Sequence, residues 1–262
     1  MKFKNLLHSI LITLLLASSL QAKALCNRIF LVGRNTDSVD RSKEGVNLVS
    51  IDIIKEIQRR TDCVYSEKNI SFSRAAEELR HNRIDIFAFA FSNPEWGIFS
   101  QHVPVYGVSR LLLVDKKHYK QDLKVTDYLS NPKIKFGSLS GGSFFFQGDE
   151  LEQLKKEERV VFDSFPDGLI ELLMRGKLQA VFTSPIFLSR FKKQYNVEEK
   201  AAIIVDPSIK LELSIFFSKK RVSEKEIQIF TKAIESMKKD GTLKKIILKY
   251  VPQEDFDKFY SL

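Results

Sequence analysis

Histidine, cysteine and tryptophan are scarce in this chain of 262 residues, which contains four, two and one of them. The histidines His81, His102 and His118 lack the spacing of metal ligands, and two cysteines are too few for a disulfide-rich scaffold. Low-complexity tracts are absent, and past residue 20 no apolar run could cross a bilayer. With 44% apolar and 29% charged residues, the chain has the balance of a soluble globular protein. We expect no metal and no cofactor.

The one long apolar run, Leu6 to Leu20, stands at the start of the chain. It follows Lys2 and Lys4 and precedes small residues near positions 22 and 24, which is the pattern of a secretory signal peptide. A membrane-spanning helix needs about 20 apolar residues, so an uncleaved anchor is the less favoured alternative. We interpret residues 1–22 as a signal peptide cleaved near 22 or 24, and the protein as periplasmic in a Gram-negative cell.

Basic residues outnumber acidic ones, and the formal net charge of the whole chain is +9. Residues 1–22 carry two lysines and no acid, so 40 basic and 33 acidic side chains remain, a net charge of +7. The lysines are interleaved with acids and apolar residues at 152–158 and 232–249, which indicates solvated helix faces. No nucleic-acid-binding motif accompanies them, and we expect no nucleic-acid partner.

The even cysteine count suits one disulfide in an oxidising compartment. Cys26 stands just before a predicted strand, and Cys63 just after the helix that follows it, so both lie at the same edge of one β-α unit. We expect a bond between them that stabilises the fold by about 4 kcal/mol in the chain-entropy model. The sequence alone does not show that their Cα atoms come within bonding range.

Strand and helix periods alternate along the chain, which favours two α/β lobes with parallel sheets. Strands are predicted at 28–33, 64–65, 84–91, 133–139, 159–162 and 178–182, and helices at 47–60, 72–80, 150–158 and 167–175. Extended apolar segments at 110–114 and 211–217 are the predicted hinge strands between the lobes. A further helix begins at a capping box of Ser223 and Glu226 and ends at Gly241.

The run from Phe230 through Asp240, Gly241 and Thr242 to Tyr250 resembles the helix, DGT turn and closing helix of family 3 extracellular solute-binding proteins. These are the amino-acid-type periplasmic receptors of ABC importers, and the resemblance covers nearly all of the mature chain. It implies an α/β fold of the type II periplasmic-binding-protein class, a two-lobe clamshell with two crossover hinge strands. Lobe 1 would comprise 25–110 and 212–262, and lobe 2 would comprise 111–211.

The resemblance also implies a monomer that closes on a small-molecule ligand and delivers it to an inner-membrane ABC permease. A protein that senses a ligand and signals to a membrane receptor would show the same features. A few similar proteins are periplasmic dehydratases, but the glutamate of their glycine loop is replaced here by Phe144. No Cys, His or paired-carboxylate cluster falls on the predicted cleft loops, so we expect no enzymatic activity.

Candidate ligand-binding residues follow the ends of the predicted strands, because ligands of open α/β sheets bind beyond the carboxyl ends of the strands. The planar guanidinium group of Arg34 could bind a carboxylate or phosphate through two hydrogen bonds, or Arg34 could be an exposed loop arginine. Phe72 is either a ligand-stacking ring or a core residue. Trp96, the one tryptophan of the sequence, stands among polar residues in a short loop, which favours a ligand platform over a core residue. The full set of candidates is Arg34, Asn35, Phe72, Arg74, Ser92, Trp96, Ser140, Ser143, Phe144 and Ser184.

The glycine-rich segment from Gly137 to Ser143 follows a predicted strand, so its amides could cradle an anion. It is no phosphate loop, because Ser143 stands where lysine is required, and no nucleophile elbow, because Ser140 is displaced by one residue. In the resembled family this segment is the second-lobe ligand loop, and Ser143 aligns with its hydroxyl contact. The alternative is a tight turn that needs glycine.

The ionic anchors of amino-acid receptors in the resembled family are missing from this chain. Their carboxylate-binding arginine follows the strand that here ends near Phe91, yet no arginine or lysine occurs between Arg83 and Arg110. Their ammonium-binding aspartate falls at Ser184. Because charge-assisted contacts are the stronger ones, the ligand is predicted not to be an ordinary α-amino acid but a molecule with a flat or apolar part and few charges.

Overall fold

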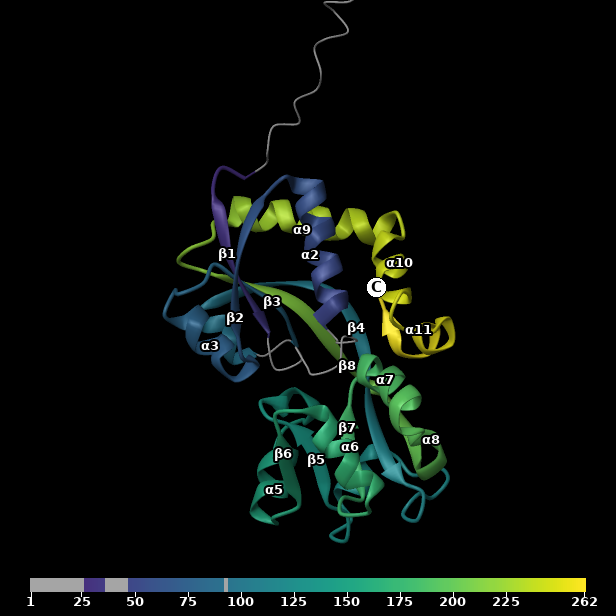
Figure 1. Ribbon diagram of the computed structural model, residues 1–262. Coiled ribbons are helices and arrows are strands. Elements are labelled where there is room, and N and C mark those ends of the chain that lie inside the picture. The colour runs from purple at the N-terminus through teal and green to yellow at the C-terminus, as the bar shows by residue number, and fades with distance from the viewer. Residues whose placement is uncertain (1–25, 36–46, 92–93) are drawn as a thin grey trace, which may run out of the picture.

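The computed structural model describes residues 26–35, 47–91 and 94–262, and shows two α/β lobes joined side to side (Figure 1). Within these residues nine strands form one sheet in the order β2-β1-β3-β8-β4-β7-β5-β6, with β9 paired to β4. The predicted signal peptide and its cleavage site lie outside the described residues. None of the described helices has the length and apolarity of a bilayer span.

The first lobe begins with alternating strands and helices, as the apolar periods predict. Its elements are β1 (Ile29–Asn35), α2 (Asn47–Thr61), β2 (Val64–Ile70), α3 (Phe72–Arg80) and β3 (Ile86–Phe91). Strand β1 lies between β2 and β3 and is parallel to both. The carboxyl ends of all three strands therefore meet at one edge of the lobe.

Two long antiparallel strands run through both lobes. They are β4 (Ser100–Asp115) and β8 (Ala201–Ser218), and their pairing extends from Ser100 opposite Ser218 to Asp115 opposite Ala201. The pairing register shifts between Ser109 and Arg110, where the strands pass from one lobe to the other. The predicted hinge segments lie inside these strands, so the two-lobe fold with two crossover strands is confirmed.

The second lobe repeats the alternation of strands and helices. Strand β5 is parallel to β6 and β7, while β7 pairs antiparallel with β4. The elements are α4 (Val125–Leu129), β5 (Phe136–Leu139), η2 (Gly142–Phe145), α5 (Glu150–Lys156), β6 (Val160–Asp163), α6 (Pro166–Met174), β7 (Ala180–Thr183), α7 (Pro185–Tyr195) and α8 (Val197–Lys200).

After β8 the chain forms α9 (Glu224–Lys239), α10 (Thr242–Leu248), α11 (Gln253–Phe259) and the short strand β9 (Tyr260–Ser261). The capping box at the start of α9 is confirmed, because the Ser223 hydroxyl accepts from the Glu226 amide and the Glu226 carboxylate accepts from the Ser223 amide. Gly241 has a left-handed φ of 76°, as a helix-ending glycine requires.

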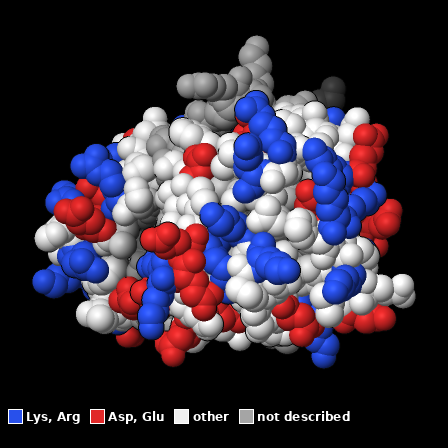
Figure 2. All heavy atoms as spheres, turned by 90° about the horizontal axis from the view of Figure 1, so that it is seen from below, with Lys and Arg blue, Asp and Glu red and all other residues white. Residues whose placement is uncertain are grey.

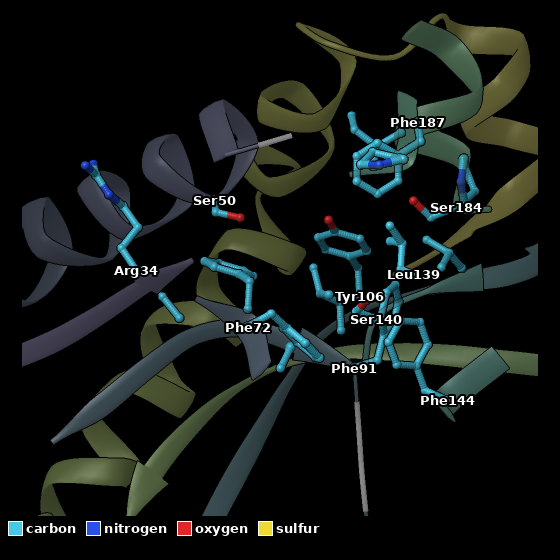
Figure 3. A pocket seen from close by; sticks show the side chains of 18 of the residues that line it. Arg34, Ser50, Phe72, Phe91, Tyr106, Leu139, Ser140, Phe144, Ser184 and Phe187 are labelled. Atoms are coloured by element: carbon cyan, nitrogen blue, oxygen red, sulfur yellow. The ribbon is translucent and has the colours of Figure 1, made fainter. Parts of the chain in front are cut away.

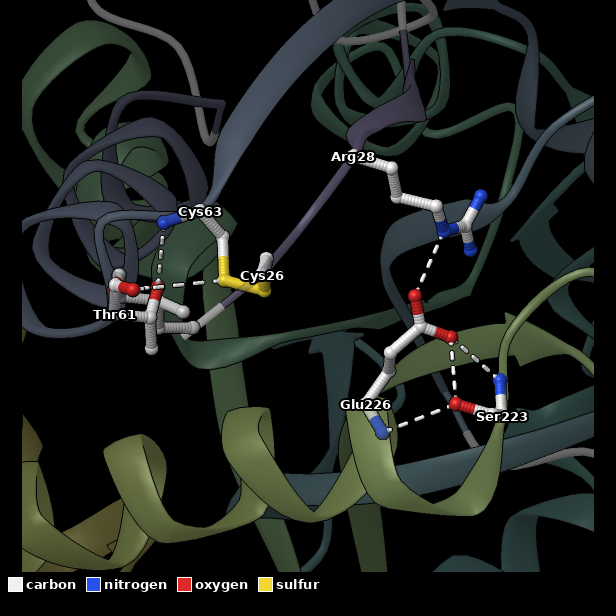
Figure 4. Close-up of a disulfide and its surroundings, with 7 residues drawn as sticks. Cys26, Arg28, Thr61, Cys63, Ser223 and Glu226 are labelled. Carbon is white, nitrogen blue, oxygen red and sulfur yellow. Dashed lines mark hydrogen bonds and ion pairs between the residues drawn. A yellow bond between two sulfur atoms is a disulfide. The ribbon is translucent and has the colours of Figure 1, made fainter. Parts of the chain in front are cut away.

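The cysteines are joined as expected, and Figure 4 shows the bond beside the start of β1. The Cα atoms of Cys26 and Cys63 are 5.0 Å apart, within the usual range for a disulfide. On the other side of β1, Arg28 pairs with Glu226 at 2.7 Å and with buried Asp85 at 3.0 Å. The disulfide and these ion pairs hold the first strand to α2 and α9.

The turn between α9 and α10 shows why the DGT sequence is a recognisable signature. The Asp240 carboxylate accepts from the Thr242 amide at 2.9 Å, and Arg60 of α2 donates to Asp240 and to the Thr242 hydroxyl. These contacts lower the pKa of Asp240 to about 2, with the Thr242 hydrogen bonds as the main cause. The turn therefore fastens the last helices to the first lobe, far from the space between the lobes.

The end of the molecule seen in Figure 2 carries lysine and arginine interspersed with aspartate and glutamate. This mixture is the pattern of solvated helix faces that the sequence indicates.

Candidate functional site

A pocket lies between the two lobes, beside the crossover strands (Figure 3). Its walls come from α2 and β3 of the first lobe, from β4 and β8, from the loops after β5 and β6 of the second lobe, and from the start of α7. The pocket contains about 1000 Å³ of space, including its open mouth. It therefore occupies the position that the carboxyl ends of the strands predict.

Phenylalanine rings from both lobes line the pocket. Phe72, Phe89 and Phe91 belong to the first lobe, and Phe144 and Phe187 to the second. The ring centroids of Phe91 and Phe144 are 4.3 Å apart, and those of Phe72 and Phe144 are 6.2 Å apart. These distances are those of interacting aromatic pairs, so the lobes touch through their rings.

A close backbone approach accompanies this contact between the lobes. Gly141, in the loop before η2, has a φ of 79°, and a Cβ atom built there would lie 3.0 Å from Cδ1 of Phe72. Any larger residue would combine a strained backbone with a collision against the first-lobe ring. Glycine is therefore needed at this point by the packing of one lobe on the other.

The backbone at Phe89 is unusual, because a bulky residue in a strand adopts a φ of 69°. The register of β3 against β8 shifts between Ala88 and Ala90, so Phe89 forms a bulge directly at the pocket. Positive φ in a bulky residue is a strained conformation that persists only when its surroundings impose it, and such residues cluster at ligand sites.

The polar groups of the pocket are hydroxyls. They come from the side chains of Ser50, Ser140, Ser164, Ser184, Tyr106 and Tyr260. Ser184 precedes Pro185 at the start of α7, where proline is well placed in the first turn. Burial raises the pKa of both tyrosines above the ordinary value, and the nearness of Tyr106 adds to the effect on Tyr260. Both phenols are therefore neutral donors and acceptors at physiological pH.

Arg34 is the one charged side chain among the described residues that line the pocket. Its guanidinium is 3.0 Å from the Glu67 carboxylate on β2. Figure 3 shows its nitrogen atoms directed away from Phe72 and Tyr106 and from the serines of the cavity. Arg34 therefore stands at the rim with its charge already partnered.

The structure brings five of the ten candidate residues to the pocket: Arg34, Phe72, Ser140, Phe144 and Ser184. Arg74 is exposed on α3 and Ser143 is exposed in η2, and neither lines the pocket. The backbone of Asn35 pairs with Ile70, but its side chain lies outside the described residues, as does all of Ser92.

Trp96 is a core residue, which is the second of the two interpretations that its sequence position allows. It lies in the short helix η1 (Pro94–Ile98) and its side chain is only 7% exposed. Its ring centroid is 4.8 Å from that of Phe216 and 6.2 Å from that of Phe72. The indole therefore supports the pocket wall from behind. The stacking surface predicted for Trp96 is provided instead by the phenylalanine rings that line the pocket.

A buried ion cluster lies behind the other side of the pocket. The Arg110 side chain is 1% exposed and pairs with Asp206 of β8 at 2.8 Å and with Glu150 of α5 at 3.0 Å. It also donates to the carbonyl oxygen of Phe145, next to the pocket residue Phe144. Arg110 thus ties the crossover strands to the second-lobe loop that carries one pocket wall.

The glycine-rich loop does not present its first amide to a ligand, because the Ser140 amide donates to the Asp163 carbonyl oxygen at 2.8 Å. In the part of the chain that the structure describes, no three His, Cys, Asp or Glu side chains gather as metal ligands would. The arrangement can enclose a small molecule by ring contacts and neutral hydrogen bonds.

Several lining residues were missed from the sequence. Ser50 lies inside a helix, and Phe187 lies in α7, which the apolar periods did not reveal. Phe89 and Phe91 belong to a strand whose apolar run could have flagged them, since they follow one another at the period of one sheet face. No local signal identifies Tyr260, which is brought to the pocket by β9.

Comparisons with known proteins agree on the fold. The family model of bacterial extracellular solute-binding proteins, family 3, matches residues 44–253. A search of curated proteins finds no match. Among solved structures, a binding component of an ABC transporter from Wolinella succinogenes, complexed with lysine, has a TM-score of 0.71 at 14% identity, covering 89% of this chain and 100% of that one.

Two further structures show the range of proteins that share this fold. A histidine kinase sensor domain has a TM-score of 0.69 at 12% identity, over 86% of this chain and 96% of that one. An ancestral amino-acid-binding protein, described as a precursor of cyclohexadienyl dehydratase, has a TM-score of 0.66 at 15% identity, over 85% of this chain and 95% of that one. Identities this low show a shared fold and leave the ligand to be argued from the pocket.

Proposed function

This chain belongs to family 3 of the bacterial extracellular solute-binding proteins, and from that premise we propose that it captures a small, largely uncharged molecule between its lobes. One observation carries the proposal: the described lining of the pocket is apolar side chains, five of them phenylalanines, together with hydroxyls, and its one charged side chain, Arg34, is paired with Glu67. A flat ligand would stack on the rings and exchange neutral hydrogen bonds with the hydroxyls.

Desolvation argues against a zwitterionic α-amino acid. Removing a carboxylate and an ammonium group from water is costly unless each finds an opposite charge. Ser184 stands where the resemblance places the ammonium-binding aspartate, and its hydroxyl supplies no charge. Although the Wolinella structure holds lysine, this pocket offers no carboxylate among its described lining residues to hold such a ligand.

In this proposal the protein works as a monomer in the periplasm and hands its ligand to an inner-membrane ABC permease. The start of the sequence, the disulfide and the family support export to an oxidising compartment. The lobes, 25–110 with 212–262 and 111–211, close by bending at β4 and β8. In this proposal the pocket performs no chemistry, since the titratable groups among its described lining residues are a partnered arginine and two tyrosines held neutral.

The ligand class is tested by thermal unfolding of the purified mature protein against three compound groups. These are neutral aromatic or heterocyclic molecules, zwitterionic α-amino acids, and dicarboxylates. A bound ligand at 100 times its Kd stabilises the folded state by about 2.7 kcal/mol, which is a readily measured rise in Tm. We expect the largest rise in the neutral group. A larger rise with lysine, arginine or glutamate would contradict the proposal.

Transport is tested separately, once a ligand is found. Deletion of the gene should reduce uptake of that radiolabelled compound by intact cells, and the wild-type gene should restore it. Unchanged uptake together with a lost transcriptional response to the compound would identify a sensor. Turnover of the compound by the purified protein would identify an enzyme.

A further inference from the structure

The segment Gln253–Ser261, which contains α11 and β9, lies alongside the crossover strands and next to α7 (Figure 1). The family match ends at residue 253, so nearly all of this segment lies beyond it. Its contacts show that it is attached to the first lobe, to the second lobe and to the hinge.

Attachment to the first lobe comes through α10, which leads into the segment. The Asp52 carboxylate of α2 accepts from Lys249 at 2.8 Å and from the Tyr250 hydroxyl at 2.9 Å. Phe256 of α11 is 6% exposed, and the Lys244 ammonium group of α10 lies 4.9 Å from the centroid of its ring. The beginning of the segment is therefore fixed to the first lobe.

Attachment to the second lobe comes from the next residues. Buried Asp255 accepts from the Ser189 hydroxyl and from the Lys192 ammonium group, each at 3.0 Å, and both donors are on α7. Phe259 is 2% exposed and packs in the second-lobe cluster with Leu188 and Phe191 of α7. A single turn of helix thus places Phe256 against α10 of the first lobe and Phe259 in the second-lobe cluster.

Attachment to the hinge comes from β9. Tyr260 pairs with Val108 of β4, and Ser261 pairs with Gly107. A Cβ atom at Gly107 would lie 2.5 Å from the Ser261 hydroxyl, so the absence of a side chain allows this close pairing. The Tyr260 ring stacks on Phe256 with centroids 5.3 Å apart, and it also lines the pocket.

We propose that Gln253–Ser261 is a strap that limits how far the lobes separate and that closes one end of the ligand pocket with Tyr260. The inference rests on the proposed function, because it assumes lobes that move. Two crossover strands alone form a hinge that can bend freely. A third connection anchored in both lobes must lose the contacts of Asp255 or Phe259 with α7 when they rotate apart, which favours the closed arrangement.

The test measures the separation of the lobes in protein without added ligand. Spin labels are attached through Glu235→Cys on α9 and Lys156→Cys on α5, both exposed and in different lobes, while Cys26 and Cys63 stay bonded. Pulsed electron paramagnetic resonance then gives the distance distribution between the labels. The strap variant is Asp255→Ala, in the full chain.

Glu78→Ala is the matched control, because the Glu78 carboxylate also accepts from two donors, Lys68 and Arg83, and all three residues lie in the first lobe, outside Gln253–Ser261 and its anchors. We expect Asp255→Ala to broaden the distribution and shift it to longer distances, and Glu78→Ala to leave it like wild type. An unshifted distance distribution for Asp255→Ala, or an equal shift for both variants, would contradict the proposal that Gln253–Ser261 is a strap.

A second variant guards against a folding defect in Asp255→Ala. Lys192→Met changes the same contact from the α7 side and leaves the segment itself intact, and we expect the same shift to longer distances. An unshifted distribution for this variant would count against the strap. The readout involves no ligand, so discovery of an ionic ligand would overturn the proposed ligand class and leave the strap result standing.

Discussion

The pocket and the layer directly behind it differ in how they use charge and rings. In the pocket, half-buried phenylalanines and hydroxyls face the cavity, and the one charged side chain, Arg34, faces Glu67. Behind it, Arg110 is completely buried between two carboxylates, and Trp96 is enclosed by other rings. The lining residues are available to contact a ligand, whereas the residues behind them hold the lining in place.

This difference fits the proposed uncharged ligand, because the pocket can keep its shape without ionic contacts to what it binds. The Arg110 cluster is structural, and it fixes the loop of Phe144 and Phe145 to the crossover strands. Substitutions in the rear layer should therefore reduce the stability of the empty protein, whereas substitutions in the lining should reduce ligand affinity.

The largest effect is expected for Arg110→Met. It leaves Asp206 and Glu150 without their buried partner, and the free energy of unfolding should fall by about 4 kcal/mol. Urea unfolding measures this change. Arg175→Met is the control, because its ion pair with Glu171 is exposed and should contribute less than about 0.5 kcal/mol. An equal loss of unfolding free energy in the two variants would show that the buried Arg110 cluster stabilises the protein no more than a surface ion pair does.

Removing one ring from the layer behind the pocket and one from the lining tests whether the two groups of residues have different roles. Trp96→Ala empties a buried site and should destabilise the empty protein by about 3 kcal/mol. Phe144→Ala removes a half-buried ring, so it should cost on the order of 1 kcal/mol in stability but reduce affinity for the identified ligand about tenfold. Chemical unfolding and calorimetric titration measure the two quantities. The reverse ranking would mean that Trp96 lines the site.

A smaller effect is expected for Tyr260→Phe. The variant keeps the ring stacked on Phe256 and removes only the hydroxyl, so stability should change little. Loss of one neutral hydrogen bond should weaken binding of the identified ligand by about 1 kcal/mol, or roughly fivefold. Unchanged affinity would show that this hydroxyl does not contact the ligand, while leaving the ring as a pocket wall.

The smallest expected effect is that of pH on ligand affinity, because the described lining of the pocket holds no histidine, carboxylate or cysteine. Affinity should change less than about twofold between about pH 5 and about pH 9, measured by calorimetry. Affinity that follows a titration in this range would reveal an ionic contact in the pocket.

Stability should respond to acid even where affinity does not. The pKa of Glu56 is lowered to about 2, chiefly by the hydrogen bond from Arg59. Burial raises the pKa of Asp85, but hydrogen bonds, the strongest from Arg221, outweigh it and lower the value. A carboxyl group whose pKa is lower in the folded than in the unfolded state stabilises the protein above about pH 4. This stabilisation is lost as the pH falls toward about 2, because the group is then protonated in both states. Unfolding midpoints at a series of pH values measure this loss.

The secondary structure of both lobes followed from local periods, because burial of one helix stripe or one strand leaves a mark at every third or second residue. The helix 47–60, the capping box at Ser223 and the disulfide were all predicted from such local features. Helix α7 was missed, since it begins directly at Pro185 after β7 and one of its four buried residues is the polar Ser189.

The amino-acid sequence by itself determined the class of fold, the hinge strands, the disulfide and the absence of ionic anchors where the resemblance places them. Tertiary structure alone decided which rings face the cavity and which support them, as Phe144 and Trp96 show, since both are aromatic residues in short 3-10 helices. It alone brought Tyr260 beside Tyr106 and Phe72 near Phe144. Such contacts join residues far apart in the chain, and the apolar period of a buried face does not tell which other element that face will meet.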